Sequence, residues 1–271
     1  MDKAMNIVNI QTKKGDEEMT NQDKAIAVLK SLAENNTKPI TDYVSEKDYI
    51  QHNLTFKEGR QTMLDALPVL KEAGTTIDIK RVITDGDYVA LQSEYNLFGH
   101  KDGFDIFRFE DGKIVEHWDN LLAVAPPNPS GHTQFDGVTE IKDLDKTEAN
   151  KKIVTSFVKD ILVGENPSKL TSYFNGDKYI QHNPSIADGL SGLGEALGAM
   201  AKAGIQMIYS DVHMVIGQGN FVLVVSEGTF AGQPTSYYDL FRVENGKIAE
   251  HWDVIETITP EVERQNTDGK F

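Results

Sequence analysis

The sequence contains no cysteine among its 271 residues. This absence excludes disulfide bonds and catalytic thiolates. It also excludes zinc and iron–sulfur sites that are held by cysteine sulfur. A nucleophile or a metal ligand in this protein must therefore come from another residue type.

Basic residues are few relative to acidic ones. The chain has 27 Lys and Arg against 42 Asp and Glu, which gives a net charge of −15 at pH 7. A surface of this sign repels phosphate backbones and anionic lipid headgroups. We therefore expect neither nucleic acid nor a membrane as a partner.

Long apolar runs are also missing. No stretch reaches the roughly 18 apolar residues that a membrane-spanning helix needs. The segment from Met1 to Thr20 mixes charged and polar residues with short apolar runs, and it lacks the apolar core of a signal peptide. These features predict a cytoplasmic protein.

The length and composition indicate a folded protein with two domains. Hydrophobic residues make up 39% and charged residues 25% of the chain, which is typical of a globular protein with a substantial core. At roughly 150 residues per domain, the chain is long enough for two compact units.

The two halves of the chain repeat each other. Tyr49–Asn53 (YIQHN) recurs as Tyr179–Asn183, and Asp105–Asp119 (DIFRFEDGKIVEHWD) recurs as Asp239–Asp253 (DLFRVENGKIAEHWD). In the longer block 11 of 15 positions are identical, and the two blocks are offset by 130 and 134 residues. Agreement of this length indicates one duplicated domain.

The copies are separated by a segment that cannot continue a helix or a central strand. Residues 125–131 (APPNPSG) contain three prolines and a glycine. We therefore place the first domain at residues 20–125, a linker at 126–144 and the second domain at 145–260.

Each copy is expected to contain two helices followed by four strands. Thr20 and Asp23 resemble a capping box at the start of the first helix, and Gly74 is a natural stop for a second helix that begins near Arg60. After Gly74 the apolar period changes to two, and Asp85–Gly86 supplies a hairpin turn. The later helices are expected near 150–162 and 191–203, and the strands near 77–83, 88–98, 104–109, 113–121, 208–216, 221–230, 237–243 and 247–255. This order predicts an α+β fold in which helices pack on one face of a curved, mainly antiparallel sheet and enclose a pocket.

The repeated motifs resemble those of a known family. The pattern of SnoaL-like polyketide cyclases is similar to three motifs of this chain, which are, in order, YIQHN, GDYV and D-x-F-R-x-x-x-G-K-I-x-E-H-W-D. These cyclases belong to the nuclear-transport-factor-2-like superfamily, which also contains ketosteroid isomerase. The resemblance covers nearly all of both copies. It implies two tandem cone-shaped domains, each with an apolar pocket, which pair through their outer sheet faces as an intramolecular pseudo-dimer and could associate further.

The resemblance also implies a function. Such relatives are often described as cyclases that act by acid/base chemistry without a cofactor. We therefore expect an enzyme of the cyclase, isomerase or aldol type that acts on a small carbonyl compound, with no cofactor and no metal. The rival hypothesis is a protein that binds a small apolar ligand in the same pocket and performs no chemistry, and a third is a structural partner domain. Convergent ionisable groups in the pocket would favour the enzyme.

Two strands supply candidate catalytic residues in each copy. Alternate residues of a strand share a face, so His117 and Asp119 lie on one face while Glu116 and Trp118 lie on the other. The resemblance to ketosteroid isomerase matches its pocket acid to Asp105, which selects His117 and Asp119 as the inward pair and turns Trp118 toward the other copy. An inward carboxyl group on an apolar stripe suits a proton donor. The corresponding residues of the second copy are Asp239, His251, Asp253 and Trp252.

A histidine of the shorter motif is a candidate general base. His52 and His182 precede the second helix of their copies, where the isomerase relatives carry their general base. An imidazole can take and return a proton near neutral pH. We therefore expect His52 to abstract a proton next to a carbonyl while Asp105 or Asp119 supports the enolate. Alternatively, the His-Asn pair is a turn element whose side chains satisfy backbone groups.

A metal site is a further alternative. His52, His117 and a carboxylate of Asp119 or Asp105 would supply two imidazoles and one carboxylate. The sequence contains no compact metal motif such as HExxH, so we favour acid/base chemistry over a metal centre.

Overall fold

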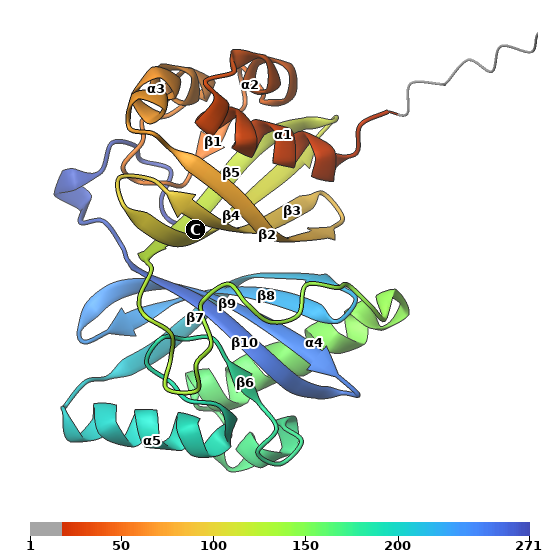
Figure 1. Cartoon of the computed structure of the whole chain (residues 1–271), viewed down its shortest axis with the longest axis vertical. Helices are drawn as coiled ribbons and strands as arrows, with labels where there is room; N and C mark the ends of the chain where they lie inside the picture. Colours follow the sequence, from red (N-terminus) through yellow and green to blue (C-terminus); the bar gives the residue numbers. More distant parts are fainter. Residues whose placement is uncertain (1–17) are drawn as a thin grey trace, which may run out of the picture.

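The structure is a computed structural model of the chain and describes residues 18–271. Residues 1–17, which form most of the segment used above to argue against a signal peptide, lie outside the described part. Two five-stranded sheets, each with its own helices, form two cone-like α+β domains (Figure 1). The predicted fold class is therefore confirmed. In residues 18–271 no helix is both long enough and apolar enough to cross a membrane.

The first domain begins with three helices and ends with four long strands. The capping box expected at Thr20 is present, because the Asp23 amide donates to Thr20 Oγ1 at 3.1 Å and the Thr20 amide donates to Asp23 Oδ2 at 3.0 Å. The elements in chain order are α1 (Asn21–Glu34), α2 (Thr37–Tyr43), β1 (Ile50–Gln51), α3 (Arg60–Glu72), β2 (Thr76–Asp85), β3 (Tyr88–Asn96), β4 (His100–Glu110) and β5 (Lys113–Ala123).

The first sheet brings its copies of the two repeated motifs side by side. Its strand order is β1-β5-β4-β3-β2, with β1 parallel to β5 and the other neighbours antiparallel. The register pairs Gln51 with His117 and Asp105 with Asp119. Directly paired residues point to the same face, so these four side chains share the concave side of the sheet.

The second domain repeats this topology but departs from it in its helices. Here α4 (Thr147–Phe157) continues into one π-helical segment (Val158–Val163), and a 3₁₀ segment (Pro167–Tyr173) follows. The sheet order is β6-β10-β9-β8-β7, with Gln181 paired to His251. The remaining elements are β6 (Ile180–Gln181), α5 (Gly189–Lys202), β7 (Met207–Gln218), β8 (Phe221–Phe230), β9 (Gln233–Glu244) and β10 (Lys247–Thr257).

Apolar side chains form three cores. One lies between the helices and the sheet of each domain. The third lies between the two sheets and contains Trp118 and Trp252, together with Phe104 and Tyr238. Figure 1 shows the two sheets facing each other, with the helices on their far sides. The prediction that both tryptophans face the other copy is confirmed.

The segment that follows each sheet packs against the other domain. After β5, the Asn128 side chain donates to the backbone oxygen of Gln181 at 2.6 Å. After β10, the Asn266 side chain donates to the backbone oxygen of Asn53 at 2.9 Å. Each domain is therefore closed by a segment that leaves the sheet of the other repeat.

Candidate active site

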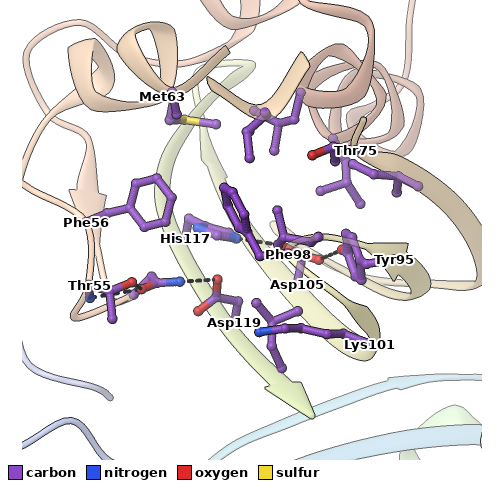
Figure 2. Close-up of a pocket in the computed structure, with 18 of the residues that line it drawn as sticks. Thr55, Phe56, Met63, Thr75, Tyr95, Phe98, Lys101, Asp105, His117 and Asp119 are labelled. Carbon is purple, nitrogen blue, oxygen red and sulfur yellow. Dashed lines mark hydrogen bonds and ion pairs between the residues drawn. The ribbon is translucent and has the colours of Figure 1, made fainter. Parts of the chain in front are cut away.

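Each domain encloses a mostly apolar cavity between its helices and the concave face of its sheet. The cavity volume is about 250 Å³ in the first domain and about 270 Å³ in the second. Figure 2 shows the first cavity, in which Phe56, Met63 and Phe98 lie opposite a group of polar side chains. The second cavity is lined by the apolar residues Leu193, Leu197, Met200, Phe230, Phe241 and Ile255.

The polar group of the first cavity consists of Asp105, His117 and Asp119, all buried and all lining the cavity (Figure 2). His117 Nε2 lies 2.9 Å from Asp105 Oδ1. The second cavity has the same arrangement, with 3.0 Å between the corresponding atoms. Its members are Asp239, His251 and Asp253.

A buried glutamine fixes where the protons of His117 lie. The Asn53 amide donates to Gln51 Oε1 at 2.9 Å, and Gln51 Nε2 donates to the Tyr49 hydroxyl at 3.0 Å. The oxygen of this amide therefore faces His117 Nδ1, 3.0 Å away, so Nδ1 carries a hydrogen. A second proton then lies between His117 Nε2 and Asp105, shared by an imidazole and a carboxylate.

The surroundings favour the protonated form of both pocket histidines. Burial opposes a charge on His117, but its hydrogen bond with Asp105 and the negative charge of Asp119 outweigh burial and raise the pKa of His117. Burial also opposes a charge on His251, and the equivalent carboxylates likewise raise the pKa of His251. Each pair therefore retains its proton up to a higher pH than an ordinary histidine would.

The second aspartate of each pocket is held by an asparagine. Asn53 Nδ2 donates to Asp119 Oδ2 at 2.7 Å, and Asn183 Nδ2 donates to Asp253 Oδ2 at 2.8 Å. The other oxygen of Asp253 is buried and has no hydrogen-bond partner among residues 18–271. Burial raises the pKa of Asp253, against the opposing charge of His251. An unpartnered carboxylate oxygen in a cavity is open to a bound molecule.

A buried tyrosine completes each hydrogen-bonded group, and sequence analysis missed both tyrosines. The Tyr95 hydroxyl donates to Asp105, and the Tyr209 hydroxyl lies 3.2 Å from Asp239 Oδ2. Burial raises the pKa of Tyr95 and Tyr209 well above the ordinary phenol value, so both remain donors. Tyr95 is on β3 and Tyr209 is on β7, which are not equivalent strands, so comparing the repeats could not reveal them.

His52 does not line the first cavity, so the prediction that it is the general base there is wrong. His52 Nε2 lies 2.9 Å from Glu116 Oε1, and the ring stacks on Trp118 with 4.7 Å between centroids. Gln51 and Asn53 point into the cavity, so the residue between them points to the outer face of the sheet.

The same correction applies to His182. Its side chain is fully buried, lies 2.9 Å from Glu250 and stacks on Trp252 at 4.6 Å. The alternation rule that selected His117 would have excluded both histidines if it had been applied to the YIQHN motif. The same rule would have identified Gln51 and Asn53 as pocket residues.

The metal site proposed from His52 is therefore wrong as well. Ligand atoms of Asp105, His117 and Asp119 do lie within 4.8 Å of one another and could hold a metal ion. Tyr95 and Asn53 already donate to these carboxylates, and a metal bound to His117 Nε2 would have to displace its contact with Asp105.

The chain was compared with known proteins. Residues 154–251 match the family described as "SnoaL-like domain". The comparison with curated proteins finds no match.

The solved structures to which the chain is similar include the following three. A putative polyketide cyclase, IdmH of Streptomyces antibioticus, is 14% identical over 38% of this chain and 92% of its own, with a TM-score of 0.33. A SnoaL-like polyketide cyclase of Agrobacterium tumefaciens is 16% identical over 39% of this chain and 93% of its own, with a TM-score of 0.33. An NTF2-like protein of unknown function from Cytophaga hutchinsonii is 13% identical over 40% of this chain and 94% of its own, with a TM-score of 0.34.

Proposed function

From the SnoaL-like domain that residues 154–251 form, and from the buried polar group in each cavity, we propose that the protein is a cofactor-independent acid/base enzyme. Its substrate would be a small carbonyl compound, and its reaction an isomerisation or an aldol-type cyclisation. One observation carries this proposal. The hydrogen-bonded pair of His117 and Asp105 lies beside Asp119 in an apolar cavity, and the second domain repeats the arrangement.

The geometry assigns a role to each group. Asp119 takes a proton from the carbon next to the carbonyl, and the electrons of that C–H bond form an enolate. The proton shared by His117 and Asp105 bonds to the enolate oxygen and so stabilises it. Asn53 holds one oxygen of Asp119 and leaves the other for the substrate. If a C=C bond lies next to the reacting carbon, the resulting dienolate takes the proton back from Asp119 at its γ carbon, which moves the double bond. Otherwise the enolate carbon attacks a second carbonyl of the same molecule, and the new alkoxide oxygen takes that proton.

The cavities limit the size and polarity of the substrate. Each is somewhat smaller than the roughly 300–1,000 Å³ of a typical ligand pocket. The walls are mostly apolar, although Thr55, Thr75 and Lys101 also line the first cavity, so the substrate would be compact and largely apolar, with its carbonyl directed at the sheet. In this environment the contacts to a developing negative charge are stronger than in water.

The alternative function is binding of a small apolar ligand without chemistry. The apolar lining of both cavities favours it, because sequestration needs no ionisable group. It does not account for two copies of a buried group whose proton is shared between a histidine and a carboxylate. Exchange of carbon-bound hydrogen with solvent therefore distinguishes the two functions, because only the enzyme would catalyse it.

The test is exchange of carbon-bound hydrogen for deuterium in a panel of small cyclic ketones and diketones, followed by NMR in D₂O. We expect the wild type to accelerate exchange next to the carbonyl. The double variant Asp119→Asn/Asp253→Asn should lose this acceleration by about 10²-fold or more. A control is His100→Gln, whose exposed histidine pairs with Glu94 and does not belong to the polar group. Tight binding of a ketone without exchange would support the alternative instead.

A further inference from the structure

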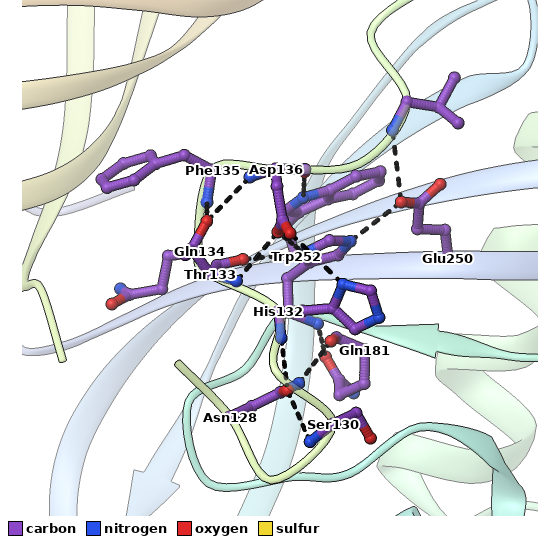
Figure 3. Close-up of polar contacts among 12 residues, drawn as sticks. Asn128, Ser130, His132, Thr133, Gln134, Phe135, Asp136, Gln181, Glu250 and Trp252 are labelled. Atoms are coloured by element: carbon purple, nitrogen blue, oxygen red, sulfur yellow. Dashed lines mark hydrogen bonds and ion pairs between the residues drawn. The ribbon is translucent and has the colours of Figure 1, made fainter. Parts of the chain in front are cut away.

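The linker between the domains forms an ordered structure on the second domain, outside both cavities (Figure 3). Asn128 anchors its start by donating to the backbone oxygens of Gln181 and Ile186 at 2.6 and 3.0 Å. Trp252 Nε1 anchors its middle by donating to the backbone oxygen of Asp136 at 3.0 Å. The residues between these anchors are therefore held in fixed positions.

On this part of the linker, His132 and Asp136 converge with His182, which directly follows β6 of the second domain. The two oxygens of Asp136 face one imidazole each, with 2.9 Å to His182 Nδ1 and 3.3 Å to His132 Nδ1. One ligand atom from each residue lies within 4.8 Å of those of the other two. Ligand atoms around a tetrahedral zinc ion are about 3.4 Å apart, given bonds of about 2.0–2.2 Å. Small side-chain adjustments would therefore centre an ion among them.

Carboxylates hold the far nitrogen of both imidazoles. His182 Nε2 lies 2.9 Å from Glu250 Oε1, and Glu250 is fixed by Arg242 Nε at 2.6 Å. His132 Nε2 lies 3.2 Å from Asp188 Oδ2. A histidine that binds a metal usually donates its other ring N–H to a carboxylate in this way. Both Nδ1 atoms face Asp136, and both Nε2 atoms face a second carboxylate.

We propose that His132, Asp136 and His182 form a binding site for a divalent transition-metal cation, for which zinc is the best match. Two imidazoles and a carboxylate are ligands that zinc prefers. The fourth position of a tetrahedral ion would be left for water, as in zinc sites with three protein ligands. The side chains of His132 and Asp136 are 31% and 45% exposed, so an ion can enter from solvent.

The first domain provides an internal comparison. His52 has the same surroundings as His182, because it stacks on Trp118 and lies 2.9 Å from Glu116. The segment that covers it, however, presents the backbone oxygen of Gly269 at 2.9 Å. Within residues 18–271, His52 belongs to no cluster of possible metal ligands. The proposed site is therefore a feature of the second domain alone.

An ion at this site would fasten the linker to the second domain. Asn128 and His132 lie on the linker, while His182 directly follows Gln181, which lines the second cavity. Bound metal would therefore stabilise the wall of that cavity without entering it. The inference does not depend on the proposed enzymatic function.

The test uses the full chain after treatment with a chelator. We expect calorimetric titration with Zn²⁺ to show one saturable equivalent, and Co²⁺ to give the intense visible absorption of a tetrahedral complex. The variant His132→Ala/Asp136→Asn should lose both signals. Asp188→Asn, which removes the negative charge behind His132 and keeps an oxygen that can accept from the Gln181 amide, should weaken Zn²⁺ binding by about 10- to 100-fold.

The control is Asp105→Asn/Asp239→Asn, which alters the acidic groups of both cavities. It should bind Zn²⁺ as the wild type does. Loss of binding in this control, with binding retained in His132→Ala/Asp136→Asn, would place the metal in the cavities and overturn the proposal. The absence of a saturable equivalent in the wild type would overturn it as well.

Discussion

At the scale of single residues, the pocket depends on a shared proton rather than on any one side chain. Gln51 fixes the hydrogen on His117 Nδ1, so the imidazole meets Asp105 through Nε2. Tyr95 donates to the same carboxylate from the other side. These hydrogen bonds fix the other polar atoms of His117 and Asp105. The proton between the two side chains is therefore the one that a bound molecule would affect most.

The raised pKa of His117 and His251 predicts how stability depends on pH. In the unfolded chain these histidines have a pKa of about 6.5. In the folded protein the pKa is raised, so they bind the proton more tightly. Their contribution to stability is therefore fully present below about pH 6.5 and is lost as the pH rises through the higher folded value. Urea unfolding at a series of pH values should show the free energy of unfolding falling across this window.

The variant His117→Gln/His251→Gln should show a shallower fall than the wild type, even though its absolute stability is lower. NMR titration of the histidine ring protons checks the same prediction directly. Resonances that disappear in the variant should titrate above about 6.5 in the wild type. Equal pH slopes for the two proteins would contradict the prediction.

At the scale of strands and helices, the two domains reach the same hydrogen bond by different routes. The register makes Gly103 the counterpart of Tyr237, and Tyr95 the counterpart of Gly228. In the first domain the ring of Tyr95 occupies the space that Gly103 leaves empty. In the second, Tyr209 reaches Asp239 from β7 and stacks on Tyr237 at 4.1 Å. A tyrosine donor to the aspartate is thus retained although its strand has changed.

This packing predicts that Gly103 cannot carry a side chain. A Cβ at this position would lie 2.5 Å from Leu121 Cδ2 and 2.9 Å from Tyr95 Cε2. Gly103→Ala should therefore lower the free energy of unfolding by about 1–3 kcal/mol, as measured by urea unfolding. The control is Gly198→Ala on the exposed side of α5, where a Cβ meets nothing within 4 Å and stability should rise by about 0.4–1 kcal/mol. A neutral Gly103→Ala would contradict this account of the packing.

Elements with a clear period or a clear stop could be predicted from the sequence, and short elements could not. The helix expected from Arg60 to about residue 73 is α3, and the capping box at Thr20 is present. The role of Gln51 was missed because alternation was not applied to the YIQHN motif, whose strand β1 has only two residues. The seven-residue helix α2 was missed because it is too short to show a period.

The candidate site was predictable only where alternation along a strand decides the face. His117 and Asp119 lie two residues apart on β5 and both point inward, as expected. His52 was assigned as the general base because its position resembles that of the isomerase base. Its neighbours Gln51 and Asn53 line the cavity, so the His52 side chain points to the opposite face. Tyr95 could not be identified, because its hydrogen bond to Asp105 depends on tertiary packing.

At the scale of the whole molecule, a loop beside each pocket is held by a segment that leaves the sheet of the other repeat. The C-terminal segment packs on the loop after β1, where the Gln265 amide donates to the backbone oxygen of Leu54 at 2.8 Å. Farther along, the buried Lys270 Nζ donates to the backbone oxygen of Asp119 at 2.7 Å. The linker makes the equivalent contacts with the second domain through Asn128. The pocket loops are therefore held from outside their own domain.

This crossed arrangement predicts that damage to one segment loosens the opposite pocket. Asn266 Nδ2 donates to the backbone oxygens of Asn53 and Phe56, both at 2.9 Å, and it is 5% exposed. Asn266→Ala leaves both oxygens without this donor and should cost about 1–3 kcal/mol. Hydrogen exchange followed by mass spectrometry should show faster exchange in residues 51–58 and no change in residues 181–188.

The matched variant is Asn128→Ala, which removes the donor to Gln181 and Ile186. It should show the reverse pattern, with faster exchange in residues 181–188 only. If both variants loosened the same domain, the crossed arrangement would not hold the pockets. If each loosens only the opposite pocket, the two repeats depend on each other locally as well as through the core between their sheets. In that case neither pocket loop would keep its position in one domain produced alone, because that domain would lack the segment that contacts the loop from the other half.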